Sequence, residues 1–189
     1  MKDHNTNSAI KNSDEEILSL FKSKKTENSG MTLLMNTHRQ SLYHHIRRMT
    51  ESHEDTDDIL QNVFVKVYRA IGKFEGNSKL STWLYRIATN ETLTFLKKQK
   101  LKVVHEEQNQ KYLNQIKVED QMGGDEIIAL LQKAIGILPE KQRLVFSMRY
   151  FDEMSYSEIS NVLQVTTGGL KASFHHAVKK IEAYVKENQ

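Results

Sequence analysis

The chain has 189 residues, of which 38% are hydrophobic and 27% charged, a composition typical of a globular protein with one or two small domains. Cysteine is absent, which excludes disulfides and thiolate metal sites and favours a reducing, cytoplasmic compartment. With one proline and eight glycines the chain is poor in turn residues, and no apolar run reaches the ~18 residues of a transmembrane span, so we expect an all-α protein without membrane insertion.

The N-terminal part of the chain predicts a small helical bundle. Residues 1–13 are polar, and we expect them to be disordered. Asp14 is placed to cap a first helix. Apolar side chains that recur at helical spacing then predict two further helices, at residues 31–49 and 56–71.

A fourth helix follows a glycine-containing loop at residues 72–81, and Ser81 is its expected cap. This helix carries the chain's only tryptophan, Trp83. We expect Trp83 to lie in the core, because tryptophan is highly buried on average. An exposed asparagine on the same helix, Asn90, is a candidate for reading a DNA base.

Charge is sorted into blocks along the chain. Residues 51–58 carry five acids and no lysine or arginine. Residues 73–104 carry seven basic and two acidic side chains, a net charge of +5, whereas residues 105–126 carry six acidic and two basic ones, a net charge of −4. Solvated helix faces explain any single block, but the alternation indicates separate acidic and basic surfaces.

The C-terminal part predicts a second small helical domain. Weak periodicity and high charge at residues 101–125 predict a linker, which divides the chain into domains at residues 14–100 and 126–189. Asp125 is placed to cap the first helix beyond the linker, and Pro139 suits the first turn of the next one. The predicted helices are at residues 127–138, 140–150, 156–163 and 167–186.

The last two predicted helices have helix-turn-helix spacing. Ser155 is the expected cap of the first, a tight corner follows at residues 162–165, and Thr166 or Thr167 caps the second. We expect Ile159, Leu163 and the apolar side of the second helix to face inward. The opposite side is polar and basic, without an acid from residue 166 to 181, and such a helix can enter the major groove of DNA. A plain helical bundle with one basic face has the same pattern.

The sequence predicts no metal site, no cofactor and no catalytic residue. Adjacent helical residues point about 100° apart, so neither His44–His45 nor His175–His176 is placed to share one ion. The chain contains no Ser/His/Asp set and no phosphate-binding loop, which argues against an enzyme.

Two long segments resemble one protein family. EDTDDILQNVFVKVYRAIGKFEGNSKLSTWLYRIATNETLTFLKK, residues 54–98, closely resembles the promoter-opening domain of the extracytoplasmic-function sigma factors of bacterial RNA polymerase. LPEKQRLVFSMRYFDEMSYSEISNVLQVTTGGLKASFHHAVKKIE, residues 138–182, resembles their second domain, which holds a helix-turn-helix. The two matches have the order and separation of the family and cover about residues 14–187. This combination is far more specific than a lone helix-turn-helix.

The resemblance implies a region-2 domain at residues 14–100, a linker, and a region-4 domain at residues 126–189. The acidic helix of the first domain would dock on the clamp helices of the polymerase's largest subunit. The residues that this implies for core-polymerase binding are Asp55, Asp57, Asp58 and Gln61.

The resemblance also implies two DNA contacts. The loop after the acidic helix and the helix that follows it would melt the −10 element and hold a flipped base. The implied −10 residues are Phe74, Asn77, Lys79, Arg86, Asn90, Lys97 and Lys98. The second domain would bind the −35 element through its recognition helix, and the implied residues are Thr167, Lys171, Ala172, Ser173, His175, His176 and Lys179.

The family pattern differs at some of these positions. Many members have arginine where this chain has Lys171 and His176, so a bidentate contact with guanine is less expected here. Asn77 and Lys79 replace commoner acidic and apolar residues, which leaves the base preference open. The resemblance further implies core RNA polymerase, promoter DNA and an anti-sigma factor as partners of a protein that is monomeric when free.

One alternative remains open from the sequence. A conventional helix-turn-helix regulator would bind duplex DNA as a dimer, without core polymerase. It would need a dimerisation helix and a ligand pocket, whereas the sequence has no heptad seam and leaves the helix of Trp83 and Asn90 unexplained.

Overall fold

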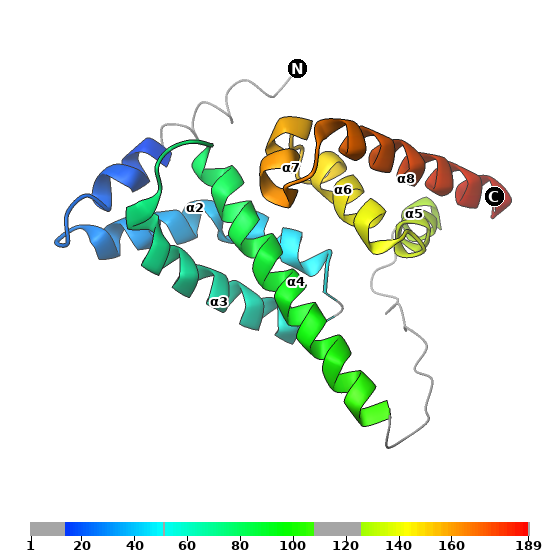
Figure 1. The fold of residues 1–189 in the computed structure, drawn as a ribbon, viewed down its shortest axis with the longest axis horizontal. Helices are drawn as coiled ribbons and strands as arrows, with labels where there is room; N and C mark the ends of the chain where they lie inside the picture. Colours follow the sequence, from blue (N-terminus) through cyan, green and yellow to red (C-terminus); the bar gives the residue numbers. More distant parts are fainter. Residues whose placement is uncertain (1–13, 51, 108–125, 189) are drawn as a thin grey trace. The chain divides into compact units, whose positions relative to one another are not determined.

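The computed structural model describes residues 14–50, 52–107 and 126–188 (Figure 1). These ranges fold into helices joined by turns and short connections, without a strand, as the sequence predicts for an all-α protein. The chain separates into two compact units, the first mainly from residues up to Thr94 and the second mainly from residues after it, so α4 begins in the first unit and extends beyond it. The predictions for residues 1–13, for Asp125 and for most of the linker lie outside the described residues.

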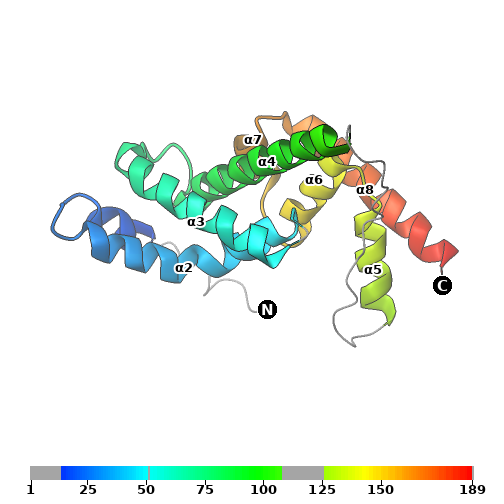
Figure 2. The same cartoon turned by 90° about the horizontal axis from the view of Figure 1, so that it is seen from below.

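The first unit contains all of the helices predicted for it. A helix at residues 14–20 precedes α2, α3 and the short 3-10 helix η1, and α4 closes the set. Helices α2 and α3 lie side by side, and α4 runs across them (Figures 1 and 2). The bounds are α2 Glu27–Arg47, α3 His53–Ala70, η1 Ile71–Lys73 and α4 Leu80–Glu107.

Several helix bounds differ from the prediction: α2 is Glu27–Arg47 rather than residues 31–49, and α5 is Glu126–Gly136 rather than residues 127–138. Two further helix starts differ because of the residues at the cap. Helix α3 begins at His53, since the Ser52 hydroxyl accepts a hydrogen bond from the Asp55 backbone N–H at 3.1 Å. The prediction that Ser81 caps α4 is wrong. Helix α4 begins at Leu80, and the Lys79 carbonyl already accepts from the Trp83 N–H at 3.1 Å, so Ser81 lies inside the first turn.

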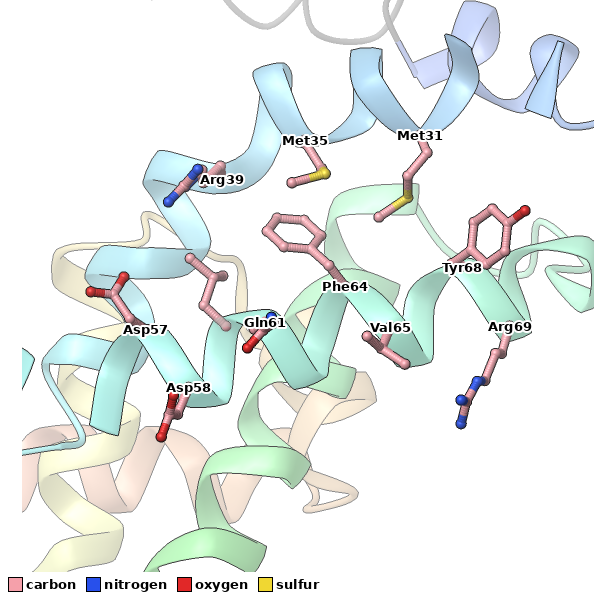
Figure 3. Close-up of a pocket in the computed structure, with 11 residues that line it drawn as sticks. Met31, Met35, Arg39, Asp57, Asp58, Gln61, Phe64, Val65, Tyr68 and Arg69 are labelled. Carbon is pink, nitrogen blue, oxygen red and sulfur yellow. The ribbon is translucent and has the colours of Figure 1, made fainter. Parts of the chain in front are cut away.

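The core of the first unit is built from one apolar stripe on each helix, as predicted. Helices α2 and α3 run antiparallel, with Met35 of α2 pointing toward Phe64 of α3 (Figure 3). The side chains that are fully or almost fully buried include Leu34, Leu42 and Ile46 of α2, Ile59, Val63 and Val67 of α3, and Leu84 and Ala88 of α4. Their burial supplies the main driving force for folding this unit.

The expectation that Trp83 lies in the core is wrong. Trp83 is only partly buried, and its ring packs against the ring of Phe74 with 5.4 Å between centroids. Leu84, the next residue, takes the core position and is completely buried. Successive helical residues point about 100° apart, so Trp83 projects in a different direction from Leu84 and lies at the edge of the core.

A buried polar contact ties α2 to α4. Nε2 of His45 lies 3.0 Å from the Thr89 hydroxyl, and this hydroxyl donates to the Tyr85 carbonyl at 2.7 Å. Because the hydroxyl proton is used toward Tyr85, His45 acts as the donor to Thr89. The Tyr85 ring stands edge-on to the His45 ring at 4.9 Å.

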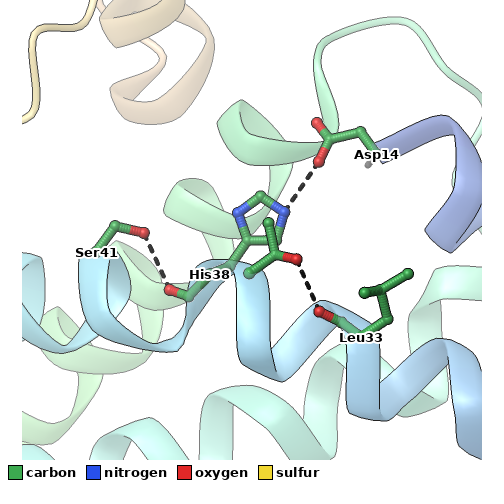
Figure 4. Close-up of polar contacts among 5 residues, drawn as sticks. Asp14, Leu33, His38 and Ser41 are labelled. Carbon is green, nitrogen blue, oxygen red and sulfur yellow. Dashed lines mark hydrogen bonds and ion pairs between the residues drawn. The ribbon is translucent and has the colours of Figure 1, made fainter. Parts of the chain in front are cut away.

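A second buried histidine fastens the N-terminal helix to α2. His38 is 5% exposed, and its Nε2 lies 3.0 Å from a carboxylate oxygen of Asp14 (Figure 4). His38 therefore lies among the buried residues of α2 but needs a polar partner there. Asp14 supplies that partner from a different helix.

The second unit contains the four helices predicted for it. Helices α6 and α7 have the predicted bounds, and α8 packs against both α5 and α6. The observed bounds are α5 Glu126–Gly136, α6 Glu140–Tyr150, α7 Tyr156–Leu163 and α8 Thr167–Glu187. One buried cluster in this unit consists of Ala134, Leu138, Phe146, Ala177 and Ile181. Within the described ranges, every helix is too short or too polar to cross a bilayer.

The contact between Asp14 and His38 predicts a measurable loss of stability. Asp14→Ala should lower the free energy of unfolding of the first unit by about 1–2 kcal/mol, because it leaves a buried ring nitrogen without its partner. Urea unfolding followed by the fluorescence of Trp83 measures this change.

The matched control is Glu15→Ala, which removes an exposed carboxylate from the same helix. It should change the free energy of unfolding by less than about 0.5 kcal/mol. Equal stabilities for the two variants would contradict a stabilising role for the Asp14–His38 contact.

Candidate functional site

The acidic side of α3 forms one edge of a groove between α2 and α3. Asp57, Asp58 and Gln61 are exposed and line this groove, which has a volume of about 820 Å³ (Figure 3). Asp55 is partly buried and does not line the groove. Its backbone N–H donates to the Ser52 hydroxyl in the cap of α3. The structure therefore brings together three of the four predicted acidic-surface residues.

The groove also contains residues that the sequence analysis missed. Val65 and Tyr68 of α3 are 44% and 42% exposed, which is unusual for large apolar side chains. Met31 and Met35 project from α2 on the opposite wall, above Phe64 (Figure 3). Methionine side chains adapt to differently shaped partners, so the groove combines an adaptable apolar surface with carboxylates at one end. The signal in the sequence was the position of Val65 and Tyr68 outside the buried stripe of α3.

The loop before α4 places an aromatic pair beside polar side chains. Phe74 and Trp83 are both partly buried and pack against each other. Asn77 and Lys79 are exposed in the same loop, and the Asn77 amide donates to the Glu75 carboxylate at 2.9 Å. Aromatic faces that remain accessible are suited to stacking on an unpaired base.

One face of α4 continues from this pair. With about 100° of rotation per residue, Trp83, Arg86, Asn90 and Lys97 fall within a sector of about 60° around the helix. Arg86, Asn90 and Lys97 are exposed, and Lys98 is exposed beside them. The structure thus leaves the predicted −10 residues of α4 accessible on a shared, positively charged face.

An ion pair flanks Asn90. The carboxylate of Glu91, which is 16% exposed, pairs with the ammonium group of Lys66 on α3. This pair neutralises the acid next to Asn90 and ties α3 to α4. The negative charge of Glu91 is therefore compensated by Lys66 and does not cancel the positive charge of the neighbouring face of α4.

The helix-turn-helix in the second unit has the predicted caps and corner. The Ser155 hydroxyl accepts from the Glu158 N–H at 3.2 Å, and the Glu158 carboxylate accepts from the Ser155 N–H at 2.8 Å, which forms a capping box. Gln164 ends α7 in the left-handed conformation with φ 56°. Thr166 rather than Thr167 caps α8, with its hydroxyl accepting from the Gly169 N–H at 3.3 Å.

Helix α8 buries one side and exposes the other, as predicted. Leu170 and Ala177 are buried, and Phe174 stacks on Phe146 with 5.8 Å between ring centroids. In α7, Ile159 is buried, whereas Leu163 is only partly buried. Six of the seven predicted −35 residues are exposed, namely Thr167, Lys171, Ala172, His175, His176 and Lys179, and Ser173 is partly buried.

The described side chains contain no group of three or more His, Asp or Glu residues placed to hold a metal ion. The rings of His175 and His176 are 6.1 Å apart and tilted by 55°, so each projects separately from α8. What the structure offers is a capped helix-turn-helix with an accessible polar and basic helix, the geometry of a helix-turn-helix DNA-binding protein.

Comparisons with known proteins identify the two units. The family model for Sigma-70 region 2 matches residues 34–102, and the family model for Sigma-70 region 4 matches residues 128–181. The chain is 29% identical over 175 residues to the ECF RNA polymerase sigma factor SigW of Bacillus subtilis, which covers 87% of this chain and 93% of that protein. It is 30% identical over 142 residues to the ECF RNA polymerase sigma-E factor of Escherichia coli strain K12, which covers 70% of this chain and 74% of that protein.

Solved structures share the fold. The sigma factor RpoE of Bartonella quintana, in complex with the anti-sigma factor NepR, superimposes with a TM-score of 0.69 and 18% identity, over 84% of this chain and 98% of RpoE. CnrH, in complex with the cytosolic domain of CnrY, gives a TM-score of 0.68 and 18% identity, over 94% of this chain and 99% of CnrH.

The chain belongs to the extracytoplasmic-function sigma factors of bacterial RNA polymerase. It is a subunit that binds core polymerase and directs it to promoters, and sigma factors are initiation factors rather than enzymes. The comparisons do not favour the alternative of a dimeric regulator that works without polymerase.

The corner of the helix-turn-helix predicts an asymmetric response to substitution at Gln164. Gln164→Gly should raise the free energy of unfolding or leave it unchanged, because glycine adopts the left-handed conformation without strain. Gln164→Val should lower it by more than about 1 kcal/mol, because a β-branched side chain is disfavoured there. Thermal unfolding followed by circular dichroism compares the two, and a valine variant as stable as the glycine variant would contradict the assigned corner.

Proposed function

We propose that this sigma factor uses three separate surfaces during initiation. The groove between α2 and α3 binds core polymerase, the outer face of α4 binds the −10 element, and α8 binds the −35 element. The observation that carries the proposal is that α4 and α8 each expose a basic face of their own, Arg86 to Lys97 on one and Lys171 to Lys179 on the other. One chain can therefore contact a promoter at two places.

The groove is suited to the clamp helices of the polymerase's largest subunit. A partner helix that lies between α2 and α3 would bury Val65, Tyr68 and the methionines of α2, which supplies affinity. Asp57 and Asp58 would attract basic side chains at one end and fix the orientation of the partner. Gln61 would add hydrogen bonds, while Asp55 contributes mainly through the cap of α3.

The α4 surface is suited to a strand that has left the duplex. The Phe74–Trp83 pair offers aromatic surface to an unstacked base, and Asn90 offers a donor and an acceptor to its edge. Arg86, Lys97 and Lys98 would follow the phosphates of the strand, and Lys79 and Asn77 would contact it from the loop.

The α8 surface is suited to the major groove of the −35 element. Thr167, Lys171 and Ala172, which are exposed near its N-terminus, would reach the bases or the phosphates. His175, His176 and Lys179, which are exposed further along the helix, would extend this contact. Ser173 is partly buried and would contribute from the edge of this face.

An anti-sigma factor is the expected regulator. RpoE of Bartonella quintana and CnrH, which share this fold, were both solved with a protein partner, NepR named as an anti-sigma factor and CnrY through its cytosolic domain. A protein that covers the groove or the α4 face would block the corresponding function. Because the polymerase and the chromosome are cytoplasmic in bacteria, we infer the same location for this protein.

The polymerase surface is tested by reversing its charge. The double variant Asp57→Lys, Asp58→Lys should bind core polymerase about tenfold more weakly than the natural protein. The two introduced lysines would repel the basic side chains of the partner that the natural carboxylates attract. Size-exclusion chromatography and competition with the natural protein measure the affinity.

The control is the double variant Glu15→Lys, Glu16→Lys, which makes the same change of charge on the exposed side of the N-terminal helix. It should bind core polymerase normally. Equal binding by both double variants would exclude the groove. Failure of the natural protein to co-elute with core polymerase, together with tight binding of palindromic duplex by the protein alone, would favour a dimeric regulator.

The α4 surface is tested at Asn90. Asn90→Ala should bind core polymerase normally but lose open-complex formation on duplex promoter DNA by about tenfold or more, because the flipped base loses its hydrogen-bonding partner. Permanganate footprinting on promoters with each base at each −10 position measures opening and base preference. Asn62→Ala, on an exposed part of α3 outside the groove, is the control, and an unchanged base preference in Asn90→Ala would refute the assignment.

A further inference from the structure

Two methionine side chains line the groove between α2 and α3. Met31 and Met35 are four residues apart on α2, so they lie on one face of that helix. Both side chains are directed toward α3, with Met35 above Phe64 (Figure 3). Both residues are partly exposed, and a groove of about 820 Å³ admits small solutes to them.

The other methionines that the structure describes have different surroundings. Met148 is completely buried and Met154 is 6% exposed, and both belong to the second unit. Met49 is partly exposed just beyond the end of α2, but it does not line the groove. The fold therefore leaves thioethers accessible in the groove and at Met49, and it shields those of the second unit.

The thioether is the group of this chain on which a two-electron oxidant acts most readily, because cysteine is absent. With hydrogen peroxide, a lone pair of the sulfur attacks one peroxide oxygen and the O–O bond breaks. The sulfur is oxidised to a sulfoxide and the peroxide is reduced to water. Methionine sulfoxide reductases reverse the change. Their dithiol reductant becomes a disulfide, and the sulfoxide oxygen leaves as water.

A sulfoxide would change the character of this groove. The reduced methionine side chain is apolar and adapts its shape to a partner, whereas the sulfoxide is polar and carries an oxygen that accepts hydrogen bonds. Phe64, which lies beneath the two methionines, offers no hydrogen-bond donor. A partner helix that covers the sulfoxides would remove their oxygens from water without replacing the lost hydrogen bonds, which weakens binding.

We propose that Met31 and Met35 are sites of reversible oxidation, and that their sulfoxides weaken the binding of core polymerase. The proposal rests on the proposed function of the groove as the polymerase surface. It adds a modification carried by the sigma factor itself. A chain without cysteine has no thiol with which to respond to peroxide, so the accessible thioethers supply that response.

The first test treats the full-length protein with hydrogen peroxide, removes the excess with catalase and measures the affinity for core polymerase. The affinity should fall about tenfold and return after incubation with reductases for both sulfoxide epimers. Mass spectrometry of tryptic peptides locates the added oxygen, because Met31 and Met35 share the peptide of residues 26–39 and Met49 lies in that of residues 49–66. Met148 and Met154 should stay unmodified, since both are buried.

The second test removes the sulfur atoms. Met31→Leu, Met35→Leu deletes both sulfurs at nearly constant side-chain volume. The readout is the ratio of the affinities before and after peroxide, so the starting affinity of each variant does not enter. This ratio should stay near one for the leucine double variant. Met49→Leu is the matched control, because it removes a partly exposed sulfur outside the groove, and it should show the same loss as the natural protein.

A third variant imitates the product. Met31→Gln, Met35→Gln places permanent polar groups in the groove and should bind core polymerase about tenfold more weakly without any peroxide. Normal binding by this glutamine double variant would contradict the effect assigned to the sulfoxides.

The remaining outcomes separate the oxidation from the function on which it rests. A peroxide-dependent loss in the leucine double variant, or in natural protein whose Met31 and Met35 stayed reduced, would overturn the proposal. Complete oxidation of both residues without loss of affinity would also overturn it. In that case weak binding by Asp57→Lys, Asp58→Lys would leave the groove as the polymerase surface, whereas normal binding would overturn the proposed function of the groove as well.

Discussion

The structure depends on the burial of one apolar stripe per helix in units that are too small to bury more. Ile59, Val63 and Val67 of α3 are completely buried, and the other sides of that helix remain at the surface. In a unit of this size the core takes about a third of each helix, so the rest of the helix surface is free to carry charge. This constraint explains how a single short helix can stabilise the fold on one side and expose Asp57 and Asp58 on the other.

Polar contacts then fix the helices of the first unit relative to one another. The His45–Thr89 hydrogen bond joins α2 to α4 in the core, and the Lys66–Glu91 ion pair joins α3 to α4 at the surface. A buried hydrogen bond has directional geometry that apolar packing lacks, so it fixes the position of α4 along its neighbours and its rotation about its own axis. The groove and the face of α4 consequently keep a constant relative position. This suits a subunit that must hold polymerase and an opened strand at the same time.

The two proposed DNA surfaces are small. The faces of α4 and α8 each carry only a few cations, so either alone would release few counterions and would bind duplex DNA weakly at physiological salt. Attachment to polymerase would bring both faces to one promoter and make the second contact intramolecular. Weak contacts that act together would also keep the free protein from occupying DNA without polymerase.

The sequence by itself determined the helical class, the helix bounds to within a few residues, the cap at Ser155 and the helix-turn-helix corner, because these depend on periodicity and on residues close in the chain. It also determined most of the exposed residues of α8, with Ser173 as the exception, since a helix of known register fixes its own faces. Only the tertiary structure decided that Trp83 packs on Phe74 at the surface and that Met31 and Tyr68 share a groove. Each of these depends on the distance between side chains of different helices, which helix packing sets and which no local pattern in one sequence contains.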